Sequence, residues 1–170
     1  MANANLLVAL LAGCPLAPEG LGSAEWEGLV ALAVQHKLAL WLCARPKSRA
    51  IAAPGAIAGQ LEEIYLSSAA HNMRLFHELG AILRAFQAAG IPVMPLKGAC
   101  LAEEVYGDRA LRLMFDIDLL VRPRDVEHAV DVLRALGYDA NYPFDPVAEQ
   151  AYSQHMPPMS RPGAVGVELH

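Results

Sequence analysis

The fold is decided by the stretch Phe115–Val121, FDIDLLV. Its large and β-branched apolar residues predict a buried strand. Asp116 and Asp118 are two positions apart, so on a strand both side chains point to one face, with Cα atoms roughly 6.5–7 Å apart. Carboxylates held this close repel each other, and divalent cations such as Mg²⁺, which prefer oxygen ligands, would neutralise them. The alternative interpretation is an ordinary exposed strand face, with Asp116 as the residue that starts the strand.

Outward from this strand, the C-terminal half of the chain alternates between strands and helices. Short apolar runs bounded by glycine and proline indicate the strands, and apolar spacings of three and four indicate the helices. The expected strands lie near residues 91–96, 115–121, 138–141, 155–160 and 164–170, and the expected helices near 98–106, 123–136 and 146–154.

The N-terminal half has helical periodicity almost throughout. The expected helices cover residues 6–11, 23–41 with a break at His36-Lys37, and 57–86, with Gly90 as the end of the last one. Pro46 and the stretch Ala50–Gly55 predict a linker. The pattern as a whole predicts an α+β fold. In the predicted fold, a helical N-terminal region, residues 1–90, would pack on a small mixed β-sheet in residues 91–170.

Composition excludes several classes of protein. The chain has 170 residues, of which 55% are hydrophobic, so it is neither disordered nor a low-complexity chain. A net charge of −5 provides no basic field for duplex nucleic acid. No apolar stretch approaches the roughly 18 residues that a membrane-spanning helix needs. We therefore expect neither a nucleic-acid duplex nor a membrane as a partner.

The N-terminus and the cysteines bear on localisation. Residues 11–14, Leu-Ala-Gly-Cys, look like a lipoprotein cleavage box, but no positive charge precedes them and the apolar segment before them is short. The three cysteines, Cys14, Cys43 and Cys100, are far apart and odd in number, which favours reduced core thiols over disulfides. We expect a cytoplasmic protein.

A second candidate element is Lys97-Gly98, at the turn from a strand into a helix. Glycine lets the backbone approach a ligand, the helix N-terminus offers unpaired N–H groups, and Lys97 adds a positive charge. These features suit a phosphate group. The alternative is an ordinary turn.

Two further charged residues are candidates. Glu168 lies between apolar neighbours in the last expected strand and can supply a third carboxylate beside Asp116 and Asp118; an exposed glutamate on an edge strand is the alternative. Arg112 can pair with the carboxylates or contact a phosphate, or it forms a surface ion pair of little energetic value. His155 and His170 can also approach this site, since His170 shares a strand face with Glu168.

The order of these elements resembles the nucleotidyltransferase superfamily of the polymerase-β type. The closer resemblance is to its bacterial branch of uncharacterised nucleotidyltransferases, where Lys-Gly replaces Gly-Ser, an arginine precedes Asp-X-Asp-Leu-Leu-Val and a helix ends in Gly-Tyr. The matching residues are Lys97-Gly98, Arg112, the stretch Asp116–Val121, Gly137-Tyr138 and the stretch Val167–His170. The resemblance spans roughly residues 24–170, and the run 92–138 is its most specific part.

The resemblance implies a site and an activity. Asp116, Asp118 and Glu168 would be the catalytic carboxylates and would hold two Mg²⁺ or Mn²⁺ ions, while Lys97, Gly98 and Arg112 would bind the phosphates of a nucleoside triphosphate. The nucleotidyl group would pass to an acceptor that the sequence does not identify. Members of the family continue beyond the position of Glu168, so we expect an incomplete nucleotidyltransferase core in residues 91–170.

Two other functions remain open. The chain could be a catalytically silent scaffold that binds a protein partner through its helical half. It could also be a glycosyltransferase for sugar nucleotides, in which an Asp-X-Asp motif holds a metal-bound diphosphate, although no nucleotide-binding βαβ half precedes the motif here.

Overall fold

The computed structural model describes residues 2–12, 21–44, 53–153 and 155–170. Cys14, Pro46 and residues 50–52 of the predicted linker lie outside these ranges. The chain forms two compact units, one within residues 1–70 and one comprising residues 71–170. The sequence boundary at residue 90 instead marks the end of the last N-terminal helix, and the division into domains stays a prediction.

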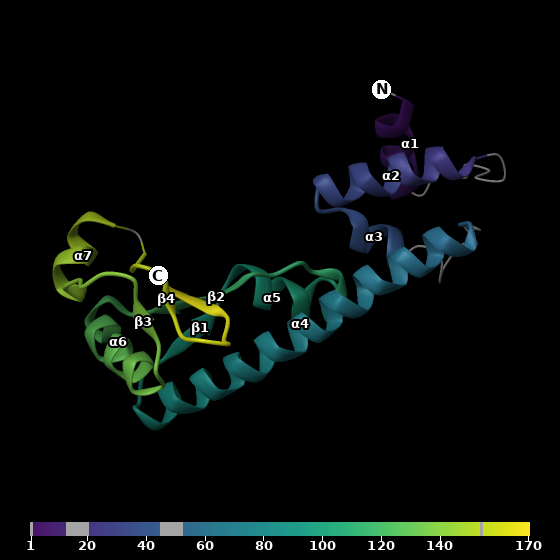
Figure 1. Ribbon diagram of the computed structural model, residues 1–170. Helices are drawn as coiled ribbons and strands as arrows, with labels where there is room; N and C mark the ends of the chain where they lie inside the picture. Colours follow the sequence, from purple (N-terminus) through teal and green to yellow (C-terminus); the bar gives the residue numbers. More distant parts are fainter. Residues whose placement is uncertain (1, 13–20, 45–52, 154) are drawn as a thin grey trace. The chain divides into compact units, whose positions relative to one another are not determined.

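The first unit is helical, as the periodicity predicted (Figure 1). Its helices are α1 (Ala2–Leu11), α2 (Ser23–Gln35), α3 (Ala39–Ala44) and the first part of α4 (Gly55–Ala88). The predicted break between α2 and α3 is present, because Lys37 has a φ of 59°. The helices enclose a core of their own, whose buried residues are Leu7, Leu10, Trp26, Leu29, Val30, Ala33, Ala39, Leu42, Ile57 and Leu61. Among the described residues, no helix combines the length and the apolarity needed to cross a bilayer.

The second unit contains a five-stranded mixed sheet. Its elements are β1 (Val93–Pro95), α5 (Lys97–Glu104), β2 (Asp116–Val121), α6 (Val126–Ala135), β3 (Asp139–Ala140), α7 (Pro146–Tyr152), β4 (Met159–Ser160) and β5 (Gly166–Leu169), with 3₁₀ turns at Arg109–Leu111 and Pro123–Asp125. The strand order is β1-β2-β5-β4-β3. Strands β2 and β5 pair in parallel, and the other neighbours are antiparallel. The predicted alternation of strands and helices is therefore confirmed.

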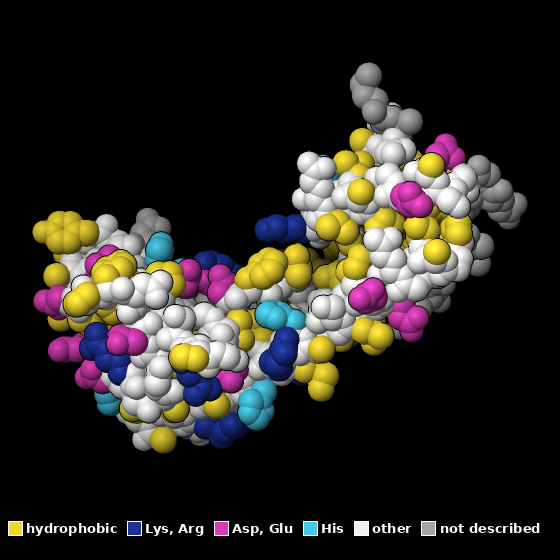
Figure 2. Space-filling view, in the orientation of Figure 1, with side chains coloured by type: hydrophobic (Ala, Val, Ile, Leu, Met, Phe, Trp, Pro, Cys, Tyr) yellow, Lys and Arg dark blue, Asp and Glu magenta, His cyan; other side chains and the backbone are white. Residues whose placement is uncertain are grey.

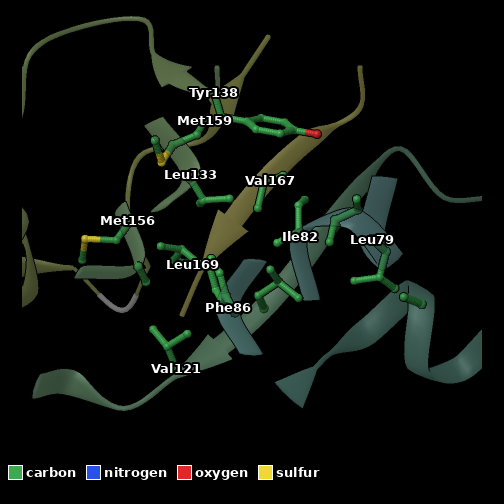
Figure 3. Packing of buried hydrophobic residues seen from close by; sticks show 14 of the residues in the cluster. Leu79, Ile82, Phe86, Val121, Leu133, Tyr138, Met156, Met159, Val167 and Leu169 are labelled. Atoms are coloured by element: carbon green, nitrogen blue, oxygen red, sulfur yellow. The ribbon is translucent and has the colours of Figure 1, made fainter. Parts of the chain in front are cut away.

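One face of this sheet is covered by the C-terminal part of α4 and by α6. Figure 3 shows side chains of both helices converging on strand β5, with Phe86 and Leu133 beside Val167 and Leu169. Ile117 of β2 is also fully buried in this core. Because side chains alternate along a strand, burying Ile117 turns the side chains of Asp116 and Asp118 to the opposite face.

A polar contact ties this core together at its edge. Tyr138, which is 1% exposed, donates a hydrogen bond from its hydroxyl to Oε2 of Glu78 at 3.0 Å. The guanidinium of Arg161 donates to the same oxygen and lies 4.9 Å above the Tyr138 ring. Burial, together with the Glu78 carboxylate, raises the pKa of Tyr138 above its usual value.

The cysteines of the described ranges are unpaired. Cys43 is half-buried, its Sγ contacts the carbonyl oxygens of Ala39 and Leu61 at 3.2 and 3.1 Å, and burial raises its pKa. Cys100 is also free but exposed, so its prediction as a core residue is wrong. It lies next to Ala99, which with Ala102 is buried in the core.

Packing of the sheet is tested by replacing two methionines. Met159 of β4 is 1% exposed and Met94 of β1 is 53% exposed. We expect Met159→Ala to lower the free energy of unfolding by about 2–5 kcal/mol, because it leaves a cavity, and Met94→Ala to change it by less than about 0.5 kcal/mol. Urea unfolding measures both values. Equal losses in the two variants would contradict the described core.

The Tyr138 contact predicts a pH dependence of stability. The pKa of Tyr138 is raised in the folded state, so the contact stabilises the fold below about pH 10, where an unfolded tyrosine keeps its proton, and this stabilisation is lost as the pH rises through the folded pKa. Tyr138→Phe should cost about 1–2 kcal/mol near neutral pH and should remove this part of the alkaline loss. Tyr142→Phe is the control, since Tyr142 is 55% exposed. Urea unfolding from pH 7 to 11 compares the three proteins, and identical alkaline profiles would contradict the prediction.

Candidate metal centre

The register between β2 and β5 brings two acidic residues together. In this parallel pair Asp118 lies opposite Glu168, and Asp116 lies opposite Gly166. The pairing continues past β5, because the backbone N–H of His170 donates to the Leu119 carbonyl at 2.8 Å. Residues 118, 168 and 170 therefore share the sheet face opposite the hydrophobic core.

Three side chains on this face form a compact group of potential ligands. Nε2 of His170 lies 2.9 Å from Oδ1 of Asp118 and 3.8 Å from Oε2 of Glu168. One ligand atom from each of the three residues lies within 4.8 Å of the others. Asp118 is only 4% exposed, and a buried carboxylate needs a cation or hydrogen-bond donors around it. The group can therefore bind a divalent ion through two carboxylates and an imidazole.

Asp116 is outside this group. Asp116 is exposed at the start of β2, two residues before Asp118. The cluster of potential ligands among the described residues consists of Asp118, Glu168 and His170. Its role as a metal ligand stays a prediction. From the sequence, His170 was expected only to approach the site. The signal that points to it is the even spacing of Glu168 and His170, which places both on one strand face.

Lys97 supplies a positive charge to the centre of this group. Its Nζ lies 2.6 Å from Oδ1 of Asp118 and 3.3 Å from Nε2 of His170. The hydrogen bond to Asp118 raises the pKa of Lys97, and the charges of Asp118, Glu168 and Asp116 act in the same direction. Lys97 has a φ of 43°, an unusual conformation for a residue other than glycine. The sequence predicted a phosphate ligand at this position, whereas here its ammonium group contacts a carboxylate.

Figure 2 shows acidic, basic and histidine side chains gathered near the C-terminal end of the chain.

Gly98 makes room for a side chain of the protein. A Cβ built on Gly98 would lie 3.0 Å from Cγ and 3.2 Å from Sδ of Met114, a contact tighter than ordinary packing. The absence of a side chain at Gly98 therefore lets Met114 pack against α5. The predicted close approach of a phosphate at Gly98 stays a prediction.

A hydrogen bond to its backbone holds Arg112 in place. Its carbonyl accepts a hydrogen bond from Nδ2 of Asn72 at 2.8 Å, and the same amide group also donates to the Arg109 carbonyl. The guanidinium donates to the Leu113 carbonyl and lies 6.0 Å from the Tyr106 ring. Its buried Nε has no hydrogen-bond partner among the described residues. Arg112 therefore has an unused donor, and the structure does not bring it to Asp118 or Glu168.

Comparison with known proteins identifies the family. No curated protein and no solved structure shows significant similarity to this chain. A family model described as an uncharacterised nucleotidyltransferase matches residues 22–170, a range that includes the five strands and the group formed by Asp118, Glu168 and His170. The resemblance in the sequence is thereby confirmed, and the chain belongs to this family of uncharacterised nucleotidyltransferases.

Proposed function

We propose that this protein binds a nucleoside triphosphate together with Mg²⁺ or Mn²⁺ and transfers its nucleotidyl group to an acceptor hydroxyl. The observation that carries the proposal is the register of β2 against β5, which sets Asp118 beside Glu168 on the sheet face opposite the hydrophobic core. Membership of a nucleotidyltransferase family supports the same reaction class.

The residues present fit a divalent cation. Asp118 and Glu168 offer the oxygen ligands that Mg²⁺ and Mn²⁺ accept. The ammonium group of Lys97, at 2.6 Å from Asp118, is consistent with a site whose charge attracts cations. Asp116 points to the same sheet face and would contribute to a second ion. When bound, two such ions activate an attacking hydroxyl and stabilise the charge on the triphosphate.

The chain itself would bind and orient the substrates. Lys97 is 56% exposed at its side chain and can exchange Asp118 for a phosphate oxygen once a metal ion neutralises that carboxylate. The backbone N–H of Gly98, in the first turn of α5, would be a further phosphate donor. Arg112 would have to leave its present contact with the Leu113 carbonyl to reach a phosphate. In the reaction the acceptor oxygen bonds to the α-phosphorus, the bond from that phosphorus to the β-phosphate oxygen breaks, pyrophosphate leaves and the hydroxyl proton passes to solvent.

A partner-binding scaffold is the second candidate function. Large apolar side chains are exposed on the helical unit, among them Val34 at 52% and Leu66 at 57%. Such side chains are more frequent at protein interfaces when they form a continuous patch. A scaffold would not need the cation site, so nucleotide and metal binding distinguish the two functions. A glycosyltransferase is disfavoured, because helices rather than a nucleotide-binding βαβ unit precede β1.

Thermal unfolding with ligands tests the proposal. A nucleoside triphosphate with Mg²⁺ or Mn²⁺, present at 100 times its Kd, should add about 2.7 kcal/mol to the free energy of unfolding. That gain corresponds to an increase of several degrees in Tm. Asp118→Asn should abolish the increase, since it removes a metal-binding charge. Asp131→Asn, on the exposed side of α6, is the matched control and should keep it.

The same experiment separates the alternatives. Stabilisation by UDP-sugars but not by nucleoside triphosphates would favour a glycosyltransferase. An unchanged Tm with every nucleotide and metal would contradict the proposed nucleotidyltransferase function. The partner-binding scaffold would then be the better supported function. The unliganded Tm of Asp118→Asn must be measured as well, so that a loss of folding is not mistaken for a loss of binding.

A further inference from the structure

His170 adds a nitrogen donor to a group of oxygen donors. Its Nε2 lies 2.9 Å from Oδ1 of Asp118 and 3.8 Å from Oε2 of Glu168, and its side chain is only 15% exposed. Both other members of the group are carboxylates. The imidazole is therefore inside the ligand cluster.

The backbone holds this imidazole in place. The N–H of His170 donates to the Leu119 carbonyl at 2.8 Å, and the carbonyl of His170 accepts from the N–H of Val121 at 3.0 Å. These two bonds extend the β2–β5 pairing to residue 170. A ring fixed in this way loses little conformational freedom when it binds an ion.

The same nitrogen already faces a cation. Nζ of Lys97 lies 3.3 Å from Nε2 of His170, and an ammonium group can only donate. Oδ1 of Asp118 lies 2.9 Å from the same nitrogen and can only accept, so the two contacts require opposite tautomers of the imidazole. In the tautomer that carries its proton on Nδ1, Nε2 directs a lone pair toward Lys97. A metal ion with a vacant position can take that lone pair in place of the ammonium proton.

Nitrogen and oxygen donors select different metals. Mg²⁺ favours oxygen ligands and keeps much of its water, whereas imidazole suits Fe²⁺, Ni²⁺, Cu²⁺ and Zn²⁺. Mn²⁺ lies between these groups, because it accepts carboxylate oxygens as Mg²⁺ does but holds its water less firmly and so admits an imidazole more readily. We infer that His170 is a metal ligand and that, with Asp118 and Glu168, it makes this centre bind a first-row transition ion such as Mn²⁺ in preference to Mg²⁺. This inference rests on the metal centre of the proposed function and goes beyond it by naming a third ligand and the class of ion.

Direct binding of Mn²⁺ to the full chain tests the inference. Loss of the free Mn²⁺ signal in electron paramagnetic resonance gives the affinity for Mn²⁺. Competition by Mg²⁺ for the same site gives the affinity for Mg²⁺. Pulsed spectra of the bound ion report a ligand nitrogen by its ¹⁴N modulation. The proteins are the wild type, His170→Ala, His170→Asn and the control His128→Ala, whose imidazole is exposed on α6.

The wild type and the control should bind Mn²⁺ at least about ten-fold more tightly than Mg²⁺ and should show ¹⁴N modulation. Both His170 variants should lose the modulation and weaken Mn²⁺ binding roughly ten-fold or more, since even the loss of an outer partner of a ligand costs 10–100-fold. Their affinity for Mg²⁺ should change much less.

Two results would overturn the inference in distinguishable ways. Tight binding of both ions, lost in Asp118→Asn but equal in wild type and His170→Ala and without ¹⁴N modulation, would remove His170 as a ligand and leave the proposed function intact. Absence of binding of either ion to the wild type, with or without ATP, would overturn the inference and the proposed metal centre together. Melting curves of the unliganded variants show whether each one folds.

Discussion

The structure of the second unit depends on the parallel pairing of β2 with β5. One register, Asp118 opposite Glu168, serves both faces of the sheet. On one face it buries Ile117 and Val167 in the core that α4 and α6 cover, and on the other it joins two carboxylates from distant parts of the chain. A slip of one residue would turn charged side chains into the core. The hydrophobic core therefore enforces the geometry of the candidate site.

Charge balance is the second constraint on this face. Asp118 is almost completely buried, and Lys97 and His170 are its close partners. Removing one partner of a buried ion pair leaves a charge without compensation, which is strongly unfavourable. A divalent ion can take over this compensation and release Lys97 for an anionic substrate. The same lysine can thus stabilise the unliganded site and contact phosphates in the liganded one, and this double use links metal binding to nucleotide binding.

Much of the fold follows from periodicity, but less of the site does. The long helix up to Gly90, the FDIDLLV strand and a glutamate strand at the C-terminus were predictable, because each depends on local spacing and on glycine or proline signals. The contacts of individual side chains could not be predicted from the sequence. The space at Gly98 is filled by Met114, and Arg112 is held by Asn72; both are contacts between residues that no local pattern relates. The position of His170 was predictable only as a strand face, since its contact with Asp118 requires the register between two strands.

The central claim is that Asp118 and Glu168 bind a divalent ion on the sheet face opposite the hydrophobic core. A crystal structure of the protein grown with Mn²⁺ and a non-hydrolysable nucleoside triphosphate tests it most directly, because anomalous scattering identifies the ion. The account predicts an anomalous peak within bonding distance of Asp118 and Glu168, with Nζ of Lys97 moved from Asp118 to a phosphate oxygen. A nucleotide bound elsewhere, or Lys97 still paired with Asp118 and no anomalous peak beside it, would contradict the account.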